Sequence, residues 1–161
     1  MEPLTLRPVT DGDRDFLAAV YASTRTEELA VTSWTDAEKA GFCRMQFNAQ
    51  DAHYRQHYPA ARFEVIESAG IAIGRLYVDR WPREIRIMDI TLLPGHRGKG
   101  IGTRLLEELQ EEAAASGKLL SIHVERMNPA LKLYERLGFQ LTEDKGVYLL
   151  LGWTAGTKDV T

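Results

Sequence analysis

The fold is decided by residues 94–102, P-G-H-R-G-K-G-I-G, which read as a glycine-rich turn between a strand and a helix. Before the turn, residues 85–93 alternate in polarity as a strand does. After it, residues 100–116 carry an apolar stripe at four-residue spacing opposite a face of glutamates, which predicts an amphipathic helix. The stripe consists of Ile101, Leu105, Leu109 and Ala113. The order of strand, glycine turn and helix favours an anion site at the start of the helix.

The composition of the turn favours a phosphate or diphosphate ligand over a plain connector. The first amides of a helix have no partner inside the helix, and the helix dipole is positive there. Three glycines let a ligand approach the backbone, and two cationic side chains add donors. These residues are Gly98, Gly100, Gly102, Arg97 and Lys99. The turn fits two other glycine motifs less well, because it lacks the lysine and hydroxyl residue of a Walker loop and the third glycine of the dinucleotide fingerprint.

The remaining pattern predicts a mixed, mostly antiparallel α/β sheet with helices on both faces. We expect strands over 4–8, 63–67, 71–78, 85–93, 119–124, 139–142 and 147–153. We expect helices starting near 10–11 and over 35–58, 100–116 and 129–137, with a polar connection over 23–35. In the second helix, Phe42, Met45, Ala49 and His53 are expected to fall near one stripe. Residues 1–155 are predicted to form a single domain, and 156–161 a loose tail.

Composition narrows the class of protein. The 161 residues are 44% hydrophobic and 27% charged, with a net charge of -3, so no general attraction to nucleic acid or membranes follows. Cys43 is the one cysteine, and no apolar run is long enough to span a bilayer, so a cytoplasmic location is expected. His53 and His57 stand four residues apart, but a polar helix face explains them better than a metal site. No metal is expected.

Two motifs resemble those of the GCN5-related N-acetyltransferase (GNAT) family. Arg97, Gly100 and Gly102 match every fixed position of that family's acyl-CoA loop, Q/R-x-x-G-x-G/A. Residues 128–139, N-P-A-L-K-L-Y-E-R-L-G-F, resemble a second family segment that follows one helix and one strand later. The matching residues of that segment are Asn128, Leu133, Tyr134, Gly138 and Phe139. Ala130 departs from the pattern by lying one place earlier than the usual alanine, whose place Leu131 takes.

The resemblance implies an enzyme that passes the acetyl group of acetyl-CoA directly to an amine. The diphosphate is expected on the glycine turn, the pantetheine arm along the backbone of the preceding strand, and a strand amide, that of Leu92 or a neighbour, at the oxyanion. The cofactor-binding residues implied are Ile90, Leu92, Arg97, Gly98, Lys99, Gly100, Ile101, Gly102, Thr103 and Asn128. Within the same fold, the alternative is a sensor that holds acetyl-CoA without efficient turnover. A nucleotide enzyme of another class fits less well, because no acidic metal motif is present.

The resemblance also implies the catalytic groups. Tyr134 matches the family's general acid, and a tyrosine is protonated at neutral pH and able to donate. The base has no fixed position in the family, so Asp89, Glu27, Glu28, His123 and His53 stay open, with Asp89 preferred because it lies in the strand before the turn.

The family builds its acceptor site around the first two helices and their connection. There, Glu27, Glu28 and Trp34 are predicted to contact an amine of a small molecule or a peptide. A final strand that pairs across subunits is common in the family, so a homodimer is expected.

Overall fold

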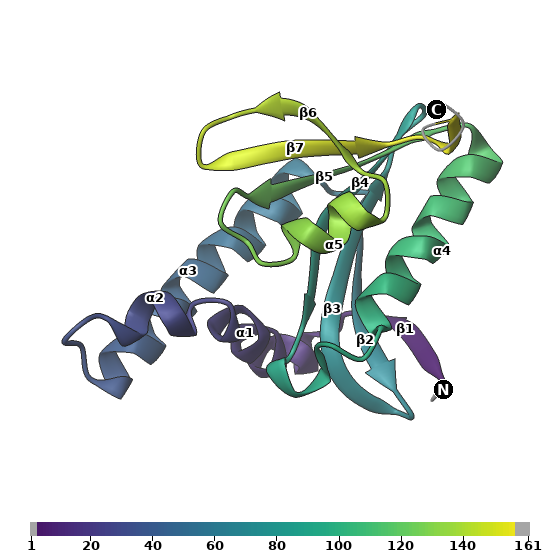
Figure 1. Cartoon of the computed structure of the whole chain (residues 1–161). Coiled ribbons are helices and arrows are strands. Elements are labelled where there is room, and N and C mark those ends of the chain that lie inside the picture. The colour runs from purple at the N-terminus through teal and green to yellow at the C-terminus, as the bar shows by residue number, and fades with distance from the viewer. Residues whose placement is uncertain (1–2, 157–161) are drawn as a thin grey trace. The chain divides into compact units, whose positions relative to one another are not determined.

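The computed structural model describes residues 3–156, so the predicted tail lies outside the described residues beyond Gly156 (Figure 1). Each predicted strand and helix is present, with one short helix added in the polar connection. The helices are α1 (Arg14–Ser23), α2 (Thr26–Ala30), α3 (Asp36–His57), α4 (Ile101–Ser116) and α5 (Leu131–Arg136). The strands are β1 (Leu4–Pro8), β2 (Arg62–Ser68), β3 (Ile71–Arg80), β4 (Glu84–Leu92), β5 (Leu119–Glu125), β6 (Gln140–Asp144) and β7 (Tyr148–Trp153).

Within the described residues, the strands form a seven-stranded sheet in the order β1-β2-β3-β4-β5-β7-β6. Strands β4 and β5 are parallel, whereas β1–β2, β5–β7 and β6–β7 are antiparallel. The predicted mixed and mostly antiparallel α/β class is therefore confirmed. The parallel pair of β4 and β5 requires a crossover, and α4 lies between these two strands in the chain.

The chain divides into two compact units. The first unit contains the chain up to Leu76 together with Thr91–His96, and the second contains Tyr77–Ile90 together with the chain from Arg97 on. Strands β3 and β4 each contribute to both units. The single domain over 1–155 stays a prediction. No helix in the described part of the chain is both long and apolar enough to cross a membrane.

In the first unit, α1 packs on α3 through a small apolar core of Leu17, Ala18, Tyr21 and Phe47. The expected stripe of α3 is wrong, because the helix buries Cys43 and Phe47 while Met45 is 61% exposed. Helix α3 begins as predicted, with the Thr35 hydroxyl accepting from the Glu38 amide and the Glu38 carboxylate accepting from the Thr35 amide.

An ion-pair cluster links β1, the start of α1 and β2 in the first unit. Arg7 donates two hydrogen bonds to Asp13, at 2.7 and 2.8 Å, and a third to Glu67 at 2.8 Å. Asp13 also accepts from the backbone amide of Thr10 at 2.8 Å. The Arg7 guanidinium holds the pKa of the Asp13 carboxyl well below its usual range, since it stabilises the charged form.

In the second unit, α4 buries Leu105, Leu109 and Ala113, as its stripe predicts. It also buries Gln110, whose side-chain amide donates to the carbonyl of Leu137 after α5. Helix α5 starts at Leu131 rather than at Pro129, because the Asn128 side chain accepts from the Ala130 amide at 2.8 Å and holds a turn there.

Candidate functional site

The glycine turn has the open backbone that an anion site needs. Gly98 and Gly100 have φ angles of 72° and 82°, in the left-handed region that favours glycine, and a Cβ at either would meet nothing within 4 Å. Gly100 occupies the N-cap position of α4 with no side-chain cap, and its carbonyl accepts from the Arg104 amide at 3.0 Å. The amides of residues 101–103 therefore precede the first hydrogen bond of the helix, where a phosphate binds best.

The pairing of β4 with β5 ends before either strand ends. Their pairing runs from Glu84↔Leu119 to Ile87↔Ile122, while β4 continues to Leu92 and β5 to Glu125. Ile90 and Leu92, the residues expected beside the pantetheine arm, lie in this last part of β4 and are partly buried. A diverging pair of strands offers backbone to an extended amide chain.

Within the first unit, β3 approaches the end of β4 so closely that position 74 must be a glycine. A Cβ at this glycine would lie 2.2 Å from the carbonyl oxygen of Thr91, a separation that no side chain tolerates. The amide of Leu93 donates to the carbonyl of Ile73 at 2.8 Å, which fixes the chain just before the glycine turn. The backbone that leads into the turn is therefore held by its neighbour strand.

Tyr134 and Asp89, the two catalytic residues expected from the sequence, lie near one another in the second unit. Tyr134 is 4% exposed and packs edge-on against Phe139, with ring centroids 5.9 Å apart. Burial raises the pKa of Tyr134 above its usual range, and the negative charge of Asp89 raises it further. The Oδ2 atom of Asp89 is shielded from solvent. The phenol thus stays protonated at neutral pH and can donate a proton.

The other predicted cofactor residues surround the turn in different ways. Arg97, Gly98, Lys99 and Gly100 are exposed, as a docking surface requires, while Ile101, Gly102 and Thr103 are partly buried at the start of α4. Asn128 is exposed, and its side-chain oxygen already accepts from the Ala130 amide. Asn128 therefore has a structural role in the turn before α5 whether or not it touches a ligand.

The predicted acceptor residues lie in the first unit. Glu27 and Glu28 belong to α2, both exposed, and Glu28 accepts from Arg25 at 2.9 Å. Trp34 is 39% exposed and packs edge-on against Phe42 at 5.0 Å between ring centroids. The sequence interpretation missed Arg25, which also lies over the ring of the buried Tyr21, with its guanidinium 5.3 Å from the ring centroid. In the sequence, only the four-residue spacing between Tyr21 and Arg25 indicated this contact.

A polar network missed by the sequence interpretation crosses β4, β5 and the β6–β7 turn in the second unit. Arg86 donates to Ser121 at 2.7 Å and to Glu84 at 2.9 Å, and its NH1 atom lies 3.2 Å from Nδ1 of His123. On the other side of the ring, Lys145 Nζ lies 3.2 Å from Nε2 of His123. Burial and the two cations lower the pKa of His123, so the ring is neutral at pH 7.

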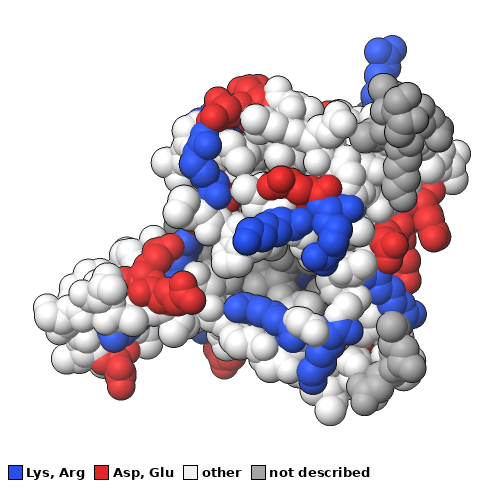
Figure 2. Space-filling model, viewed as in Figure 1, with Lys and Arg blue, Asp and Glu red and all other residues white. Residues whose placement is uncertain are grey.

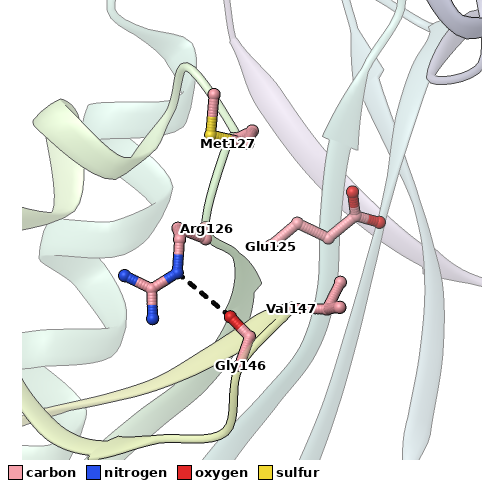
Figure 3. Close-up of a pocket in the computed structure, with 5 residues that line it drawn as sticks. All are labelled: Glu125, Arg126, Met127, Gly146 and Val147. Atoms are coloured by element: carbon pink, nitrogen blue, oxygen red, sulfur yellow. Dashed lines mark hydrogen bonds between the residues drawn. The ribbon is translucent and has the colours of Figure 1, made fainter.

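A cavity of about 450 Å³ lies beside this network, also within the second unit (Figure 3). It is lined by Glu125, Arg126, Met127, Gly146 and Val147. Figure 3 shows Arg126 turned toward the Gly146 carbonyl, to which it donates at 3.0 Å, while Glu125 and Val147 point to the other side.

The face drawn in Figure 2 carries charges of both signs. Lysine and arginine side chains gather near the middle of this face, and aspartate and glutamate lie in separate groups. The rings of His53 and His57 on α3 lie 4.3 Å apart between centroids and are tilted by 42°. Residues 3–156 contain no group of three or more His, Cys, Asp or Glu that could hold a metal ion.

Comparison with known proteins identifies the family. Residues 31–141 match the family model of the acetyltransferase (GNAT) domain. The chain is 29% identical over 143 residues to the N-alpha-acetyltransferase RimI of Mycobacterium tuberculosis, covering 86% of this chain and 80% of that protein. Over 61 residues it is 41% identical to a streptothricin acetyltransferase of Streptomyces lavendulae, covering 37% and 32% of the two chains.

Solved structures share the fold. The PaiA N-acetyltransferase of Thermoplasma acidophilum, crystallised with coenzyme A, superimposes with a TM-score of 0.71 at 16% identity, covering 94% of this chain and 99% of that one. The acetyltransferase YncA of Salmonella typhimurium, crystallised with acetyl-CoA, gives a TM-score of 0.57 at 22% identity, covering 94% and 93%. The family match spans more than half of the sequence and includes the glycine turn and Tyr134. The chain therefore belongs to the GNAT acetyltransferase family, as its two motifs indicate.

Proposed function

We propose that this GNAT N-acetyltransferase, which uses acetyl-CoA, passes the acetyl group directly to the amine of a small molecule or a peptide, with no covalent enzyme intermediate. The observation that carries the proposal is the glycine turn, where left-handed glycines leave the first amides of α4 open to a diphosphate. Both binding of acetyl-CoA and catalysis are assigned to this turn and the β4 strand that leads into it.

In the proposed complex, the diphosphate lies on the amides of residues 98–103, with Arg97 and Lys99 as cationic donors. The pantetheine arm lies along the backbone of Ile90 and Leu92, where β4 has left the register of β5. Asn128 contributes a further polar contact to the arm. A backbone amide of β4 near Leu92 stabilises the oxyanion, and a donor of this kind contributes about 3 kcal/mol to the transition state.

The proposed chemistry has two proton transfers. Asp89, directly or through water, takes a proton from the attacking amine, and Tyr134 protonates the departing thiolate of coenzyme A. The proximity that lets Asp89 act on the pKa of Tyr134 supports placing both at one reacting centre. The raised pKa keeps the phenol protonated at neutral pH, so it can hydrogen-bond to the sulfur and donate its proton as the carbon–sulfur bond breaks.

On the acceptor side, we propose that Glu27, Glu28 and Trp34 contact the amine substrate. The similarity to RimI, an N-alpha-acetyltransferase, supports a peptide amine, and the shorter similarity to streptothricin acetyltransferase supports a small molecule. A cytoplasmic location, supported by the single cysteine, and a homodimer are further parts of the proposal.

The first experiment is a calorimetric titration with acetyl-CoA, with ATP and NAD as controls. We expect micromolar binding of acetyl-CoA alone. A panel of amines then tests turnover by thiol release. Binding without turnover on any amine would favour a sensor of acetyl-CoA, and binding of ATP or NAD instead would contradict the proposal.

A further inference from the structure

A chain of hydrogen bonds through Arg25 joins α1, α2 and α3, three helices of the first unit (Figure 1). The hydroxyl of Tyr21 on α1 lies 3.2 Å from the side-chain oxygen of Gln46 on α3 and 3.3 Å from Nε of Arg25. The Nη1 atom of Arg25 donates to Oε1 of Glu28 on α2 at 2.9 Å. A guanidinium has donors only, so the Tyr21 oxygen accepts from Arg25 and its own hydrogen goes to Gln46. The chain therefore runs without a gap from α3 through α1 to α2.

Arg25 is held in place by groups other than Glu28. Tyr21 is 5% exposed, and the Arg25 guanidinium lies 5.3 Å from its ring centroid. The Arg25 amide donates to the carbonyl of Ala22 at 3.0 Å, and the Leu29 amide donates to the Arg25 carbonyl at 3.1 Å, so this backbone joins the end of α1 to α2. An exposed ion pair usually gains little, because two mobile side chains have to be ordered. Here the arginine is already ordered, so its contact with Glu28 has only the glutamate to fix.

Glu28 is the exposed end of this chain of hydrogen bonds. Its side chain is 58% exposed, against 20% for Arg25, and Arg25 binds its Oε1 atom. Among the described residues no other group hydrogen-bonds to Glu28, so Oε2 is left to accept from a ligand. Glu27, the neighbouring carboxylate of α2, is also exposed but forms no ion pair within residues 3–156. Glu28 is therefore ordered before a ligand binds, and a preordered group binds at a lower entropic cost.

A carboxylate held in this way binds a cation, and the chemistry of acetyl transfer indicates which one. An amine attacks a thioester only after it has lost its proton, whereas a carboxylate beside it favours the protonated form. We propose that Arg25 is a positioning residue that holds Glu28 to bind a second, unreactive cation of an acceptor with two amino groups. The inference rests on the proposed acetyl transfer and on the proposed contact of α2 with the acceptor. It adds the chemical class of the acceptor and a residue that neither sequence motif includes.

The first test measures whether Arg25 is held in the absence of any ligand. NMR of the arginine Nε–H groups, assigned with Arg25→Lys, should show slow exchange of the Arg25 proton with water, because Tyr21 accepts it. Tyr21→Phe should speed this exchange about tenfold. A fast-exchanging Arg25 proton in the native protein would overturn the positioning role.

The second test compares acetylation of 1,4-diaminobutane and 1-aminobutane, which differ by one ammonium group, through thiol release. We expect a higher kcat/KM for the diamine. Glu28→Gln should remove the difference by raising KM for the diamine about fivefold, with little change in kcat. Arg25→Gln should do the same, but should add little to a protein that already carries Glu28→Gln, because Arg25 acts through that carboxylate. Arg25→Lys should restore part of the effect, since it keeps the charge but not the fork of donors.

Arg44→Gln is the matched control, because Arg44 forms an exposed ion pair with Asp15 in the same unit. Its kinetics with both amines should equal those of the native protein. Equal kcat/KM for the two amines, acetylation of other amines but of neither of these, or additive effects of the Arg25 and Glu28 changes would overturn the inference. Failure of acetyl-CoA to bind would contradict the proposed function, and the exchange rate would then still decide whether Arg25 is held.

Discussion

At the scale of single residues, Tyr134 illustrates how burial keeps a side chain in its protonated form. Its phenol is 4% exposed and close enough to Asp89 for the carboxylate to raise its pKa. A tyrosine with a raised pKa remains fully protonated at neutral pH, so it can donate a hydrogen bond to the sulfur that departs. Its position against Phe139 at the end of α5 fixes the ring for that role.

Removing the Tyr134 hydroxyl tests this role. Tyr134→Phe should lower kcat about 100-fold, because a general acid contributes at least that much, and should leave acetyl-CoA affinity within about twofold. Steady-state kinetics and calorimetry measure the two effects. Tyr148→Phe is the matched control, since Tyr148 lies in the same unit and is 46% exposed. An unchanged kcat in Tyr134→Phe would leave this tyrosine a purely structural role.

Asp89 is expected to influence two parts of the pH profile. Asp89→Asn removes the negative charge that raises the pKa of Tyr134, so the tyrosine should titrate at lower pH than in the native protein, although burial still keeps it above its usual value. If Asp89 is the base, the acidic limb of the pH–rate profile should disappear as well. Tyrosine NMR titration checks the first effect and kinetics the second. A retained limb would point to water or another group.

The Asp13–Arg7 pair predicts a pH-dependent stability. Since the folded state lowers the pKa of Asp13, its contribution is fully present above about pH 5 and shrinks as pH falls, when the unfolded chain takes up the proton first. Asp13→Asn should reduce the free energy of unfolding by about 1–2 kcal/mol at pH 7 and by less at pH 3. Denaturant unfolding measures both. Asp15→Asn, which also loses a partner arginine but on the surface, should change little at either pH.

At the scale of elements, α4 offers a controlled test of the glycine turn. Gly100 and Gly117 lie at its two ends with φ angles of 82° and 66°, and a Cβ at either would meet nothing within 4 Å. Valine at either position should therefore impose similar backbone strain, about 1–2 kcal/mol. Only Gly100→Val should weaken acetyl-CoA binding, because its side chain fills the space over the open amides. Equal affinities in the two variants would contradict diphosphate binding at the turn.

The elements were largely predictable because their patterns are local. The stripe of α4, the start of α3 near Thr35 and the alternation of β4 each follow from neighbouring residues, and the structure confirms them. The stripe of α3 was wrong because the helix is mostly polar, so its buried face is set by what α1 presents to it. The start of α5 was predicted at Pro129, two residues too early, because the Asn128 side chain holds the chain in a turn up to Ala130.

The site was predictable only in part, for the opposite reason. The glycine turn and Tyr134 belong to short contiguous motifs, so they could be found in the sequence. Arg86, His123 and Lys145 come from three separate segments, and only the parallel β4–β5 register and the β6–β7 hairpin bring them together. His123 could be singled out as a polar residue in an apolar strand, but its contacts with Arg86 and Lys145 could not, because no local pattern links these residues.

At the scale of the whole molecule, the two compact units share strands, which bears on how the protein unfolds. Strand β3 passes from the first unit to the second after Leu76, and β4 passes back after Ile90. If one unit unfolds, the part of a shared strand in that unit loses its hydrogen-bonded neighbours. The part of the same strand in the other unit is then destabilised as well. We therefore expect a single cooperative transition, in keeping with one domain over residues 1–155.

Tryptophans in both units can test this cooperativity. Trp34 lies in the first unit, and Trp81 and Trp153 lie in the second. In one variant Trp34→Phe leaves reporters only in the second unit, and in another Trp81→Phe with Trp153→Phe leaves only Trp34. Within each variant, the fluorescence and far-ultraviolet dichroism midpoints should coincide, and acetyl-CoA at 100 times its Kd should stabilise both by about 2.7 kcal/mol. Separate midpoints, or stabilisation seen by one reporter alone, would show that the two units unfold independently and that only one of them binds the cofactor.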